Sequence, residues 1–179
     1  MEEIQVGIVM GSELDLPTME KAAEVLDHFG VSYFMTVASA HRTPERVKGL
    51  VLRGEQEGWK AIIAGAGMAA HLAGFVAAHT VIPVIGVPLA SSDLNGLDSL
   101  LSTVQMPGGI PVATMALGSA GAKNAGLFAI QIMATADSNL RDRLREYREQ
   151  QTESVEETAS RIEARSGRKT VSMSNHDVT

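Results

Sequence analysis

The sequence contains no cysteine, which excludes disulfide bonds, thiolate nucleophiles and thiolate metal ligands. Aromatic residues make up only 4% of the 179 residues, and Trp59 is the single tryptophan, so few side chains can stack on a flavin or on nucleic acid bases. The net charge of -6 lacks the basic excess that binding to nucleic acid or to an anionic membrane requires. We therefore expect neither partner, although one local cationic pocket for a phosphate is compatible with this charge.

Lys, Arg, Asp and Glu are also absent from residues 61–90, a length that would suit a membrane span. Glycines, prolines and the histidines His71 and His79 divide this stretch into short apolar runs. We interpret it as a buried strand, a helix and a second buried strand. The N-terminal segment MEEIQVGIVMGSELD starts acidic and has only a short apolar run, unlike a secretion signal, so the sequence predicts a cytoplasmic location.

Short apolar runs alternate with helical patterns along most of the chain. The runs predict strands at Ile4–Met10, Tyr33–Ala38, Ala61–Ala64, Val84–Val87 and Val112–Met115. The patterns between them predict helices at Pro17–Phe29, Pro44–Gly58, Ala69–Thr80, Leu97–Val104 and Ala120–Ala136. Because the strands are apolar on both faces, we expect a parallel sheet of about five strands with helices on both sides. With right-handed crossovers this is a three-layer, doubly wound, flavodoxin-like α/β fold.

The character of the chain changes after Asp137, where charged residues become frequent. Leu140, Leu144 and Tyr147 fall on one narrow helical stripe, which predicts a C-terminal helix that packs on a neighbour in its own domain or in another subunit. From Ser166 the sequence is polar and lacks periodicity. We therefore predict a single α/β domain over residues 1–165, including the C-terminal helix, and a disordered tail over residues 166–179.

In an open parallel sheet, ligands bind beyond the carboxyl ends of the strands, so the segments there hold the candidate site. Gly11, Ser12 and Asp15 follow the first strand. The glycine permits a tight turn, the serine can bind a phosphate at a helix start, and the aspartate can accept a hydrogen bond from a ribose hydroxyl. Helix capping by Ser12 or Asp15 explains the same residues equally well.

The segment after the second strand contains Ser39, His41 and Arg42. There His41 could carry a proton while Arg42 binds an anion, or His41 could simply bond to a loop carbonyl. Small residues follow the third strand between Gly65 and Gly74, so a ligand can approach the backbone there. His71 lies in this segment, in the first turn or two of the predicted helix, and is either catalytic or a structural residue bonded to a neighbouring loop.

Other ligand motifs are missing. The glycine spacing is not the dinucleotide fingerprint, and no Gly-Lys-Ser/Thr phosphate loop occurs. No pair of histidines has a metal-ligand spacing with carboxylates, so we expect no metal site. His28 and His79 fall within or at the end of helical patterns, which favours structural roles.

Several segments together resemble one family. They are Met10-Gly11-Ser12 with Asp15, Ser39-Ala40-His41-Arg42-Thr43-Pro44, Ala64-Gly65-Ala66-Gly67, Ala69-Ala70-His71-Leu72, Gly86-Val87-Pro88, Asp98-Ser99-Leu100 and Gln105-Met106-Pro107. In this order and spacing they resemble the N5-carboxyaminoimidazole ribonucleotide mutase family (PurE), the catalytic subunit associated with bacterial purine synthesis. The resemblance extends from about Ile4 to Tyr147.

The resemblance implies an isomerase that converts N5-carboxyaminoimidazole ribonucleotide to its 4-carboxy isomer by releasing and recapturing carbon dioxide. It implies His41 as the general acid–base. It places in the substrate site Gly11, Ser12, Asp15, Ser39, Arg42, Ala70, His71 and Leu72. Of these, Ser12, Asp15 and Arg42 would hold the ribose phosphate, and the loop through Ala70, His71 and Leu72 would form the carbon dioxide pocket. It further implies that no metal, biotin or ATP takes part and that the chain forms a homo-octamer whose sites are shared between subunits.

Three alternatives remain. A branch of the family carboxylates aminoimidazole ribonucleotide directly with carbon dioxide, but lysine is typical there at the position of Arg42. A non-catalytic nucleotide or flavin module on the same fold would bind its ligand without needing His41. A purely structural assembly protein would not need these polar residues at three strand ends. This chain departs from the family at Leu14, Met68 and Ala73, where a small polar residue, glycine and proline are common.

Overall fold

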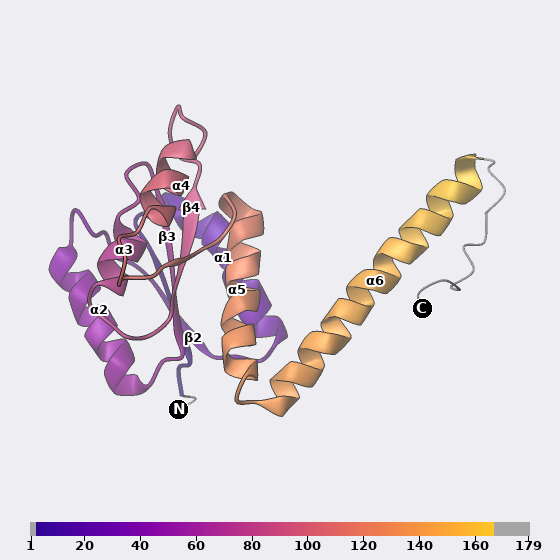
Figure 1. Ribbon diagram of the computed structural model, residues 1–179, viewed down its shortest axis with the longest axis horizontal. Helices are drawn as coiled ribbons and strands as arrows, with labels where there is room; N and C mark the ends of the chain where they lie inside the picture. The colour runs from indigo at the N-terminus through magenta and orange to yellow at the C-terminus, as the bar shows by residue number, and fades with distance from the viewer. Residues whose placement is uncertain (1–2, 167–179) are drawn as a thin grey trace. The chain divides into compact units, whose positions relative to one another are not determined.

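A computed structural model describes residues 3–166 and contains a sheet of five parallel strands in the order β2-β1-β3-β4-β5 (Figure 1). The strands are β1 (Val6–Met10), β2 (Tyr33–Val37), β3 (Ala61–Gly67), β4 (Val84–Leu89) and β5 (Ala113–Thr114). Every residue of β1 and β4 is buried, as the continuous apolar runs predict. The strand order is that of the flavodoxin-like fold, so the predicted doubly wound α/β architecture is confirmed.

Helices cover both faces of the sheet. They are η1 (Glu13–Asp15), a short 3-10 helix, α1 (Leu16–His28), α2 (Pro44–Glu57), α3 (Leu72–Ala77), α4 (Leu97–Val104) and α5 (Gly118–Ala134). Helices α1 and α5 pack against each other on one face, and α2, α3 and α4 lie on the other (Figure 1). The uncharged stretch 61–90 is β3, α3 and β4, as predicted. Among residues 3–166, none of the helices combines the length and apolar character that crossing a membrane needs.

The largest difference from the predicted boundaries lies between β3 and α3. Strand β3 continues through Gly67, because Ala66 and Gly67 still pair with β4, and α3 begins only at Leu72. The helix predicted at Ala69–Thr80 was therefore too long at both ends. The prediction that His71 lies in the first turns of this helix was also wrong, because His71 immediately precedes α3 as its N-cap residue.

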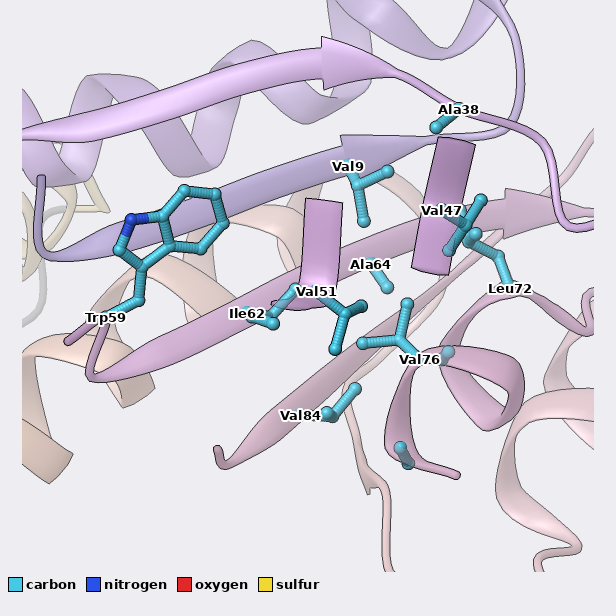
Figure 2. Close-up of a cluster of buried hydrophobic side chains, with 12 residues drawn as sticks. Val9, Ala38, Val47, Val51, Trp59, Ile62, Ala64, Leu72, Val76 and Val84 are labelled. Carbon is cyan, nitrogen blue, oxygen red and sulfur yellow. The ribbon is translucent and has the colours of Figure 1, made fainter. Parts of the chain in front are cut away.

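A buried cluster of apolar side chains lies between strands β1, β3 and β4 and helices α2 and α3 (Figure 2). Trp59, which is 4% exposed, lies at one end of the cluster, and Val47 and Leu72 lie at the other (Figure 2). The indole packs against the backbone of Gly7, where a Cβ atom would lie 2.2 Å from Cζ3 of Trp59. The absence of a side chain at Gly7 is thus what admits the tryptophan.

Helix α4 has an unusual polarity. Its side chains Ser99 and Thr103 are buried, and their hydroxyls donate to backbone carbonyls of Leu89 and Ser99. Its apolar side chains Leu97, Leu101 and Val104 are exposed at i, i+4 and i+7. The outer surface of α4 within the described residues is therefore an apolar stripe.

The chain divides into two units, Met1–Leu140 and Arg141–Thr179. The first unit holds the sheet and helices α1 to α5. The predicted C-terminal helix is present as α6 (Ser138–Ser166), and its residues from Arg141 onward are the described part of the second unit. The predicted tail over residues 166–179 lies outside the described residues, except for Ser166, which is the last residue of α6. The single domain over residues 1–165 stays a prediction.

Candidate active site

A cleft of about 510 Å³ opens at the carboxyl ends of the strands. The segments after β1, β2, β3 and β4 line it, which places it at the point where the strand order reverses between β1 and β3. Its lining includes Gly11, Ser12, Leu14, Asp15, Ser39, Ala40, His41, Arg42, Ala66, Gly67, Met68, Ala69, His71, Leu72 and Ser91. A larger hollow of about 760 Å³ lies near the amino end of β4 and around Ile110. No Lys or Arg lines that hollow, so it lacks a cation for a phosphate.

A tight turn between Ser39 and Thr43 presents the side chains of His41 and Arg42 at its tip. The N–H of Thr43 donates to the carbonyl of Ser39 over 2.8 Å, and the N–H of Ser39 donates to Oγ1 of Thr43 over 2.9 Å. Thr43 also forms the N-cap position of α2, and Pro44 follows it at the first helical position, where its fixed φ suits the helix. His41 and Arg42 are therefore exposed on a turn that is closed by reciprocal hydrogen bonds.

The imidazoles of His41 and His71 are in direct contact. Nε2 of His41 lies 2.6 Å from Nδ1 of His71, and the two rings are nearly perpendicular at 88°. In this hydrogen bond one of the two ring nitrogens donates its N–H and the other accepts it. The sequence left His71 open between a catalytic and a structural role, and the structure places it in the cleft beside His41.

Arg42 connects the segments that follow β1 and β2. Its Nη2 donates to the carbonyl of Gly11 over 2.7 Å, and its Nε lies 3.4 Å from Oγ of Ser39. In the described part of the chain Arg42 forms no ion pair with a carboxylate. Its charge thus remains available to an anionic ligand.

Ser12 and Asp15 form the helix cap that the sequence offered as an alternative to ligand binding. Oγ of Ser12 accepts from the N–H of Leu14 over 3.3 Å, and Oδ2 of Asp15 accepts from the N–H of Ser12 over 3.0 Å. Both side chains nevertheless line the cleft. Burial raises the pKa of the Asp15 carboxyl, while the Ser12 N–H and the Arg42 charge act against this shift.

The raised pKa of Asp15 predicts a pH-dependent contribution to stability. Because the folded protein holds this proton more tightly than the unfolded chain, the contribution is full below the unfolded pKa and is lost as pH rises through the folded pKa. We expect the free energy of unfolding of Asp15→Asn, which lacks this titration, to fall less than that of the wild type as pH rises from below the ordinary carboxyl pKa of 3.8 through the raised pKa of the folded protein.

Urea unfolding midpoints of both proteins across this range measure the difference. Asp93→Asn, at an exposed position after β4, serves as the control and should follow the wild type. A larger loss with rising pH in Asp15→Asn than in the wild type would contradict the prediction.

The loop after β3 explains one departure from the family pattern. Met68 has a φ of +55°, a left-handed conformation that a glycine adopts without strain, and its side chain is 60% exposed in the cleft. The preceding Gly67 leaves room for the loop after β4, because a Cβ there would lie 1.7 Å from Oγ of Ser91. The family's usual proline at the position of Ala73 would also fit this structure. Ala73 is the second residue of α3, so its N–H has no partner within the helix and a proline there would cost no helical hydrogen bond.

Among the residues that follow β4, Ser91 lines the cleft. Arg46, which lies in a groove beside Arg42, was missed at the level of the sequence. The available signal was the spacing of four residues between the two arginines at the start of a helix. No group of three or more His, Asp or Glu side chains gathers within residues 3–166 in a way that could hold a metal ion.

The fold and the cleft define a flavodoxin-like α/β protein with a histidine–arginine site at the switch point of its sheet. Residues 5–154 match the family model described as AIR carboxylase, and the chain belongs to this family.

Curated relatives named N5-carboxyaminoimidazole ribonucleotide mutase are similar over most of the chain. The Pyrococcus horikoshii protein is 53% identical over 162 residues, covering 90% of both chains. The Escherichia coli K12 protein is 52% identical over 151 residues, covering 84% of this chain and 89% of that one. The crystal structure of Treponema denticola PurE matches with a TM-score of 0.80 at 31% identity, covering 88% of this chain and 98% of that one.

Proposed function

We propose that this chain is an isomerase of purine biosynthesis that converts N5-carboxyaminoimidazole ribonucleotide to 4-carboxyaminoimidazole ribonucleotide, with His41 as the general acid–base. The observation that carries the proposal is the hydrogen-bonded pair of His41 and His71 beside Arg42, in the cleft where a parallel sheet of this order binds ligands. The names of the relatives, which share more than half of their aligned residues with this chain, support the choice of substrate.

The proposed reaction has two steps. In the first, the carbamate N–C bond breaks, carbon dioxide leaves, and the exocyclic nitrogen keeps the electron pair and takes a proton from His41. In the second, the ring carbon forms a bond to the same carbon dioxide, and His41 accepts the proton that this carbon carried. The protons balance, so the sum is an isomerisation that consumes no ATP. An imidazole suits both proton transfers because its charge changes near neutral pH.

The remaining site residues divide into a polar and an apolar side. Ser12, Ser39 and Arg42, with the backbone at Gly11, would bind the ribose phosphate, and Asp15 would accept a hydrogen bond from a ribose hydroxyl. Leu72, which is only 2% exposed, lines the cleft and provides an apolar wall next to His71, whereas Ala70 is buried and does not belong to the cleft lining. Such a wall would hold carbon dioxide near the ring carbon and avoid the entropy loss of capturing it again from solvent.

We also propose that the enzyme works in the cytoplasm as a homo-octamer whose sites are shared between subunits. The exposed apolar stripe Leu97, Leu101 and Val104 on α4 supports association, because a lone chain would leave it in water. In the same helix, Oδ1 of Asp98 is buried without a hydrogen-bond partner among the described residues. A donor from a neighbouring subunit would satisfy this oxygen.

The test is the conversion of N5-carboxyaminoimidazole ribonucleotide carrying a ¹³C-labelled carbamate, without ATP and with a chelator present. The expected result is rapid formation of the 4-carboxy isomer. Most of the ¹³C label should be retained in this product even when the buffer contains unlabelled bicarbonate. If the protein ignores this substrate but carboxylates aminoimidazole ribonucleotide with dissolved carbon dioxide, it is the direct carboxylase that the family description also covers. Inactivity on both substrates would contradict the enzyme proposal.

A further inference from the structure

A second hollow of about 540 Å³, which we name the β2 groove, continues from the cleft around the carboxyl end of β2. The two hollows share Gly11, Ser12, Ser39 and Arg42. The rest of the β2 groove is lined by Glu13, Val37, Ala38, Thr43 and Arg46. Because Arg42 lines both hollows, a ligand that fills the cleft can extend past Arg42 into the groove.

Arg46 is held at this groove by two hydrogen bonds to neutral groups of β2. Its Nε donates to the carbonyl of Val37 over 3.1 Å, and its Nη2 donates to Oγ1 of Thr36 over 3.0 Å. A guanidinium has five N–H donors, so these bonds fix the group in place and leave three donors free of them. Within residues 3–166 Arg46, like Arg42, forms no ion pair with a carboxylate.

The groove therefore combines several hydroxyl groups with two arginines that form no ion pair within residues 3–166, although the charge of Arg42 also acts on Asp15. The side chains of Ser12, Ser39 and Thr43 line it together with both arginines. Glu13 is the one carboxylate in its lining, and its side chain is exposed, where water screens its charge. A phosphate monoester carries between one and two negative charges at neutral pH, more than Arg42 alone can neutralise.

We propose that Arg46 is a second phosphate-binding residue, which contacts the phosphate of the substrate from the β2 groove while Arg42 contacts it from the cleft. This inference rests on the proposed function for the identity of the ribonucleotide. Arg46 then contributes to the selection of a ribonucleotide over the corresponding ribonucleoside, and it takes no part in the proton transfers at His41.

The test compares Arg46→Met, which keeps much of the length of the side chain, with Arg46→Lys, which keeps the charge. For Arg46→Met we expect a KM for the ribonucleotide about tenfold above the wild-type value, as for one lost charge-assisted hydrogen bond, and an unchanged kcat. The KM for the ribonucleoside should not change, and Arg46→Lys should recover most of the lost affinity. The control is Arg53→Met on the outer part of α2, where Arg53 pairs with Glu57, and it should leave the KM values unchanged.

Titration with inorganic phosphate, followed by calorimetry, gives a readout that does not depend on activity. We expect Arg46→Met to bind phosphate about tenfold more weakly than the wild type. Equal binding by the two proteins, or equal KM increases for the ribonucleotide and the ribonucleoside, would overturn the role of Arg46. If the wild type converts no substrate, the proposed function fails, while the phosphate titration still decides whether Arg46 binds the anion.

Discussion

Replacing His41 by asparagine is expected to lower kcat for the isomerisation by about a thousandfold, since general acid–base catalysis by one positioned group contributes roughly 10² to 10⁴. Asparagine can still form a hydrogen bond near His71 but has no nitrogen that takes and returns a proton at neutral pH. His41 is exposed at the tip of a closed turn, so its replacement should leave the fold unchanged. KM should change little because Arg42 and the serines remain.

Initial rates with N5-carboxyaminoimidazole ribonucleotide, measured at fixed pH for both proteins, provide the check. His79→Asn is the matched control, because Nδ1 of His79 bonds to the carbonyl of Phe75 and His79 lines the hollow near the amino end of β4 rather than the cleft. It should retain the wild-type kcat. If His41→Asn kept more than about a tenth of the wild-type kcat, far above the usual loss for a missing general base, the acid–base role would be refuted.

Replacing Gly7 by alanine is expected to lower the free energy of unfolding by about 3 kcal/mol, at the upper end of the usual range for overpacking a core. The new Cβ atom would lie 2.2 Å from Cζ3 of Trp59 and 2.5 Å from its Cε3. Neither partner can move easily, because Gly7 pairs with neighbouring strands on both sides and the indole is buried. The indole N–H would also lose its aligned bond to Glu57 if the ring tilted.

Urea unfolding followed by circular dichroism measures this change. Gly49→Ala on α2 is the control, because a Cβ there would meet nothing within 4 Å. Alanine inside a helix should instead stabilise the protein by roughly 0.5–1 kcal/mol. A Gly7→Ala protein as stable as the wild type would mean that the sheet and the indole can separate at little cost.

The architecture was predictable from the sequence wherever burial decides the pattern. Strands β1 and β4 are apolar at nearly every position because helices cover both faces, and such runs are distinctive. The end of β3 was not predictable in the same way. Ala66 and Gly67 extend the strand through backbone pairing with β4, and pairing of small residues leaves no trace in hydrophobic periodicity.

The candidate site was predictable as a set of segments but not as a geometry. The rule that ligands bind at the carboxyl ends of parallel strands was enough to choose the segments that hold His41 and His71. Their contact depends on the left-handed turn at Met68 and on the tight turn before Thr43, which neither charge nor periodicity predicts. Arg46 was missed because an arginine in an exposed helical turn usually has no ligand.

For Ser12 and Asp15 the sequence offered capping and ligand binding as alternatives. The structure shows the capping bonds and places both side chains in the cleft, so the two interpretations are compatible. Capping fixes the orientation of the serine hydroxyl and the carboxylate before any ligand arrives. The ligand-binding role of these residues stays a prediction.

The turn closed by Thr43 has a consequence for how this enzyme can diverge. His41 and Arg42 are neighbours on one short support, so a mutation that shifts the support changes the chemical step and the affinity together. A mutation in this turn that favours a new substrate would therefore lower both the rate of the chemical step and the affinity for the phosphate. The exposed side chain of Met68 lines the same cleft but is not part of the turn that carries His41 and Arg42, so a substitution that keeps the left-handed turn there can alter the pocket without shifting the turn after β2. New specificities should therefore arise from such exposed side chains after β3, while the turn after β2 and His71 stay fixed.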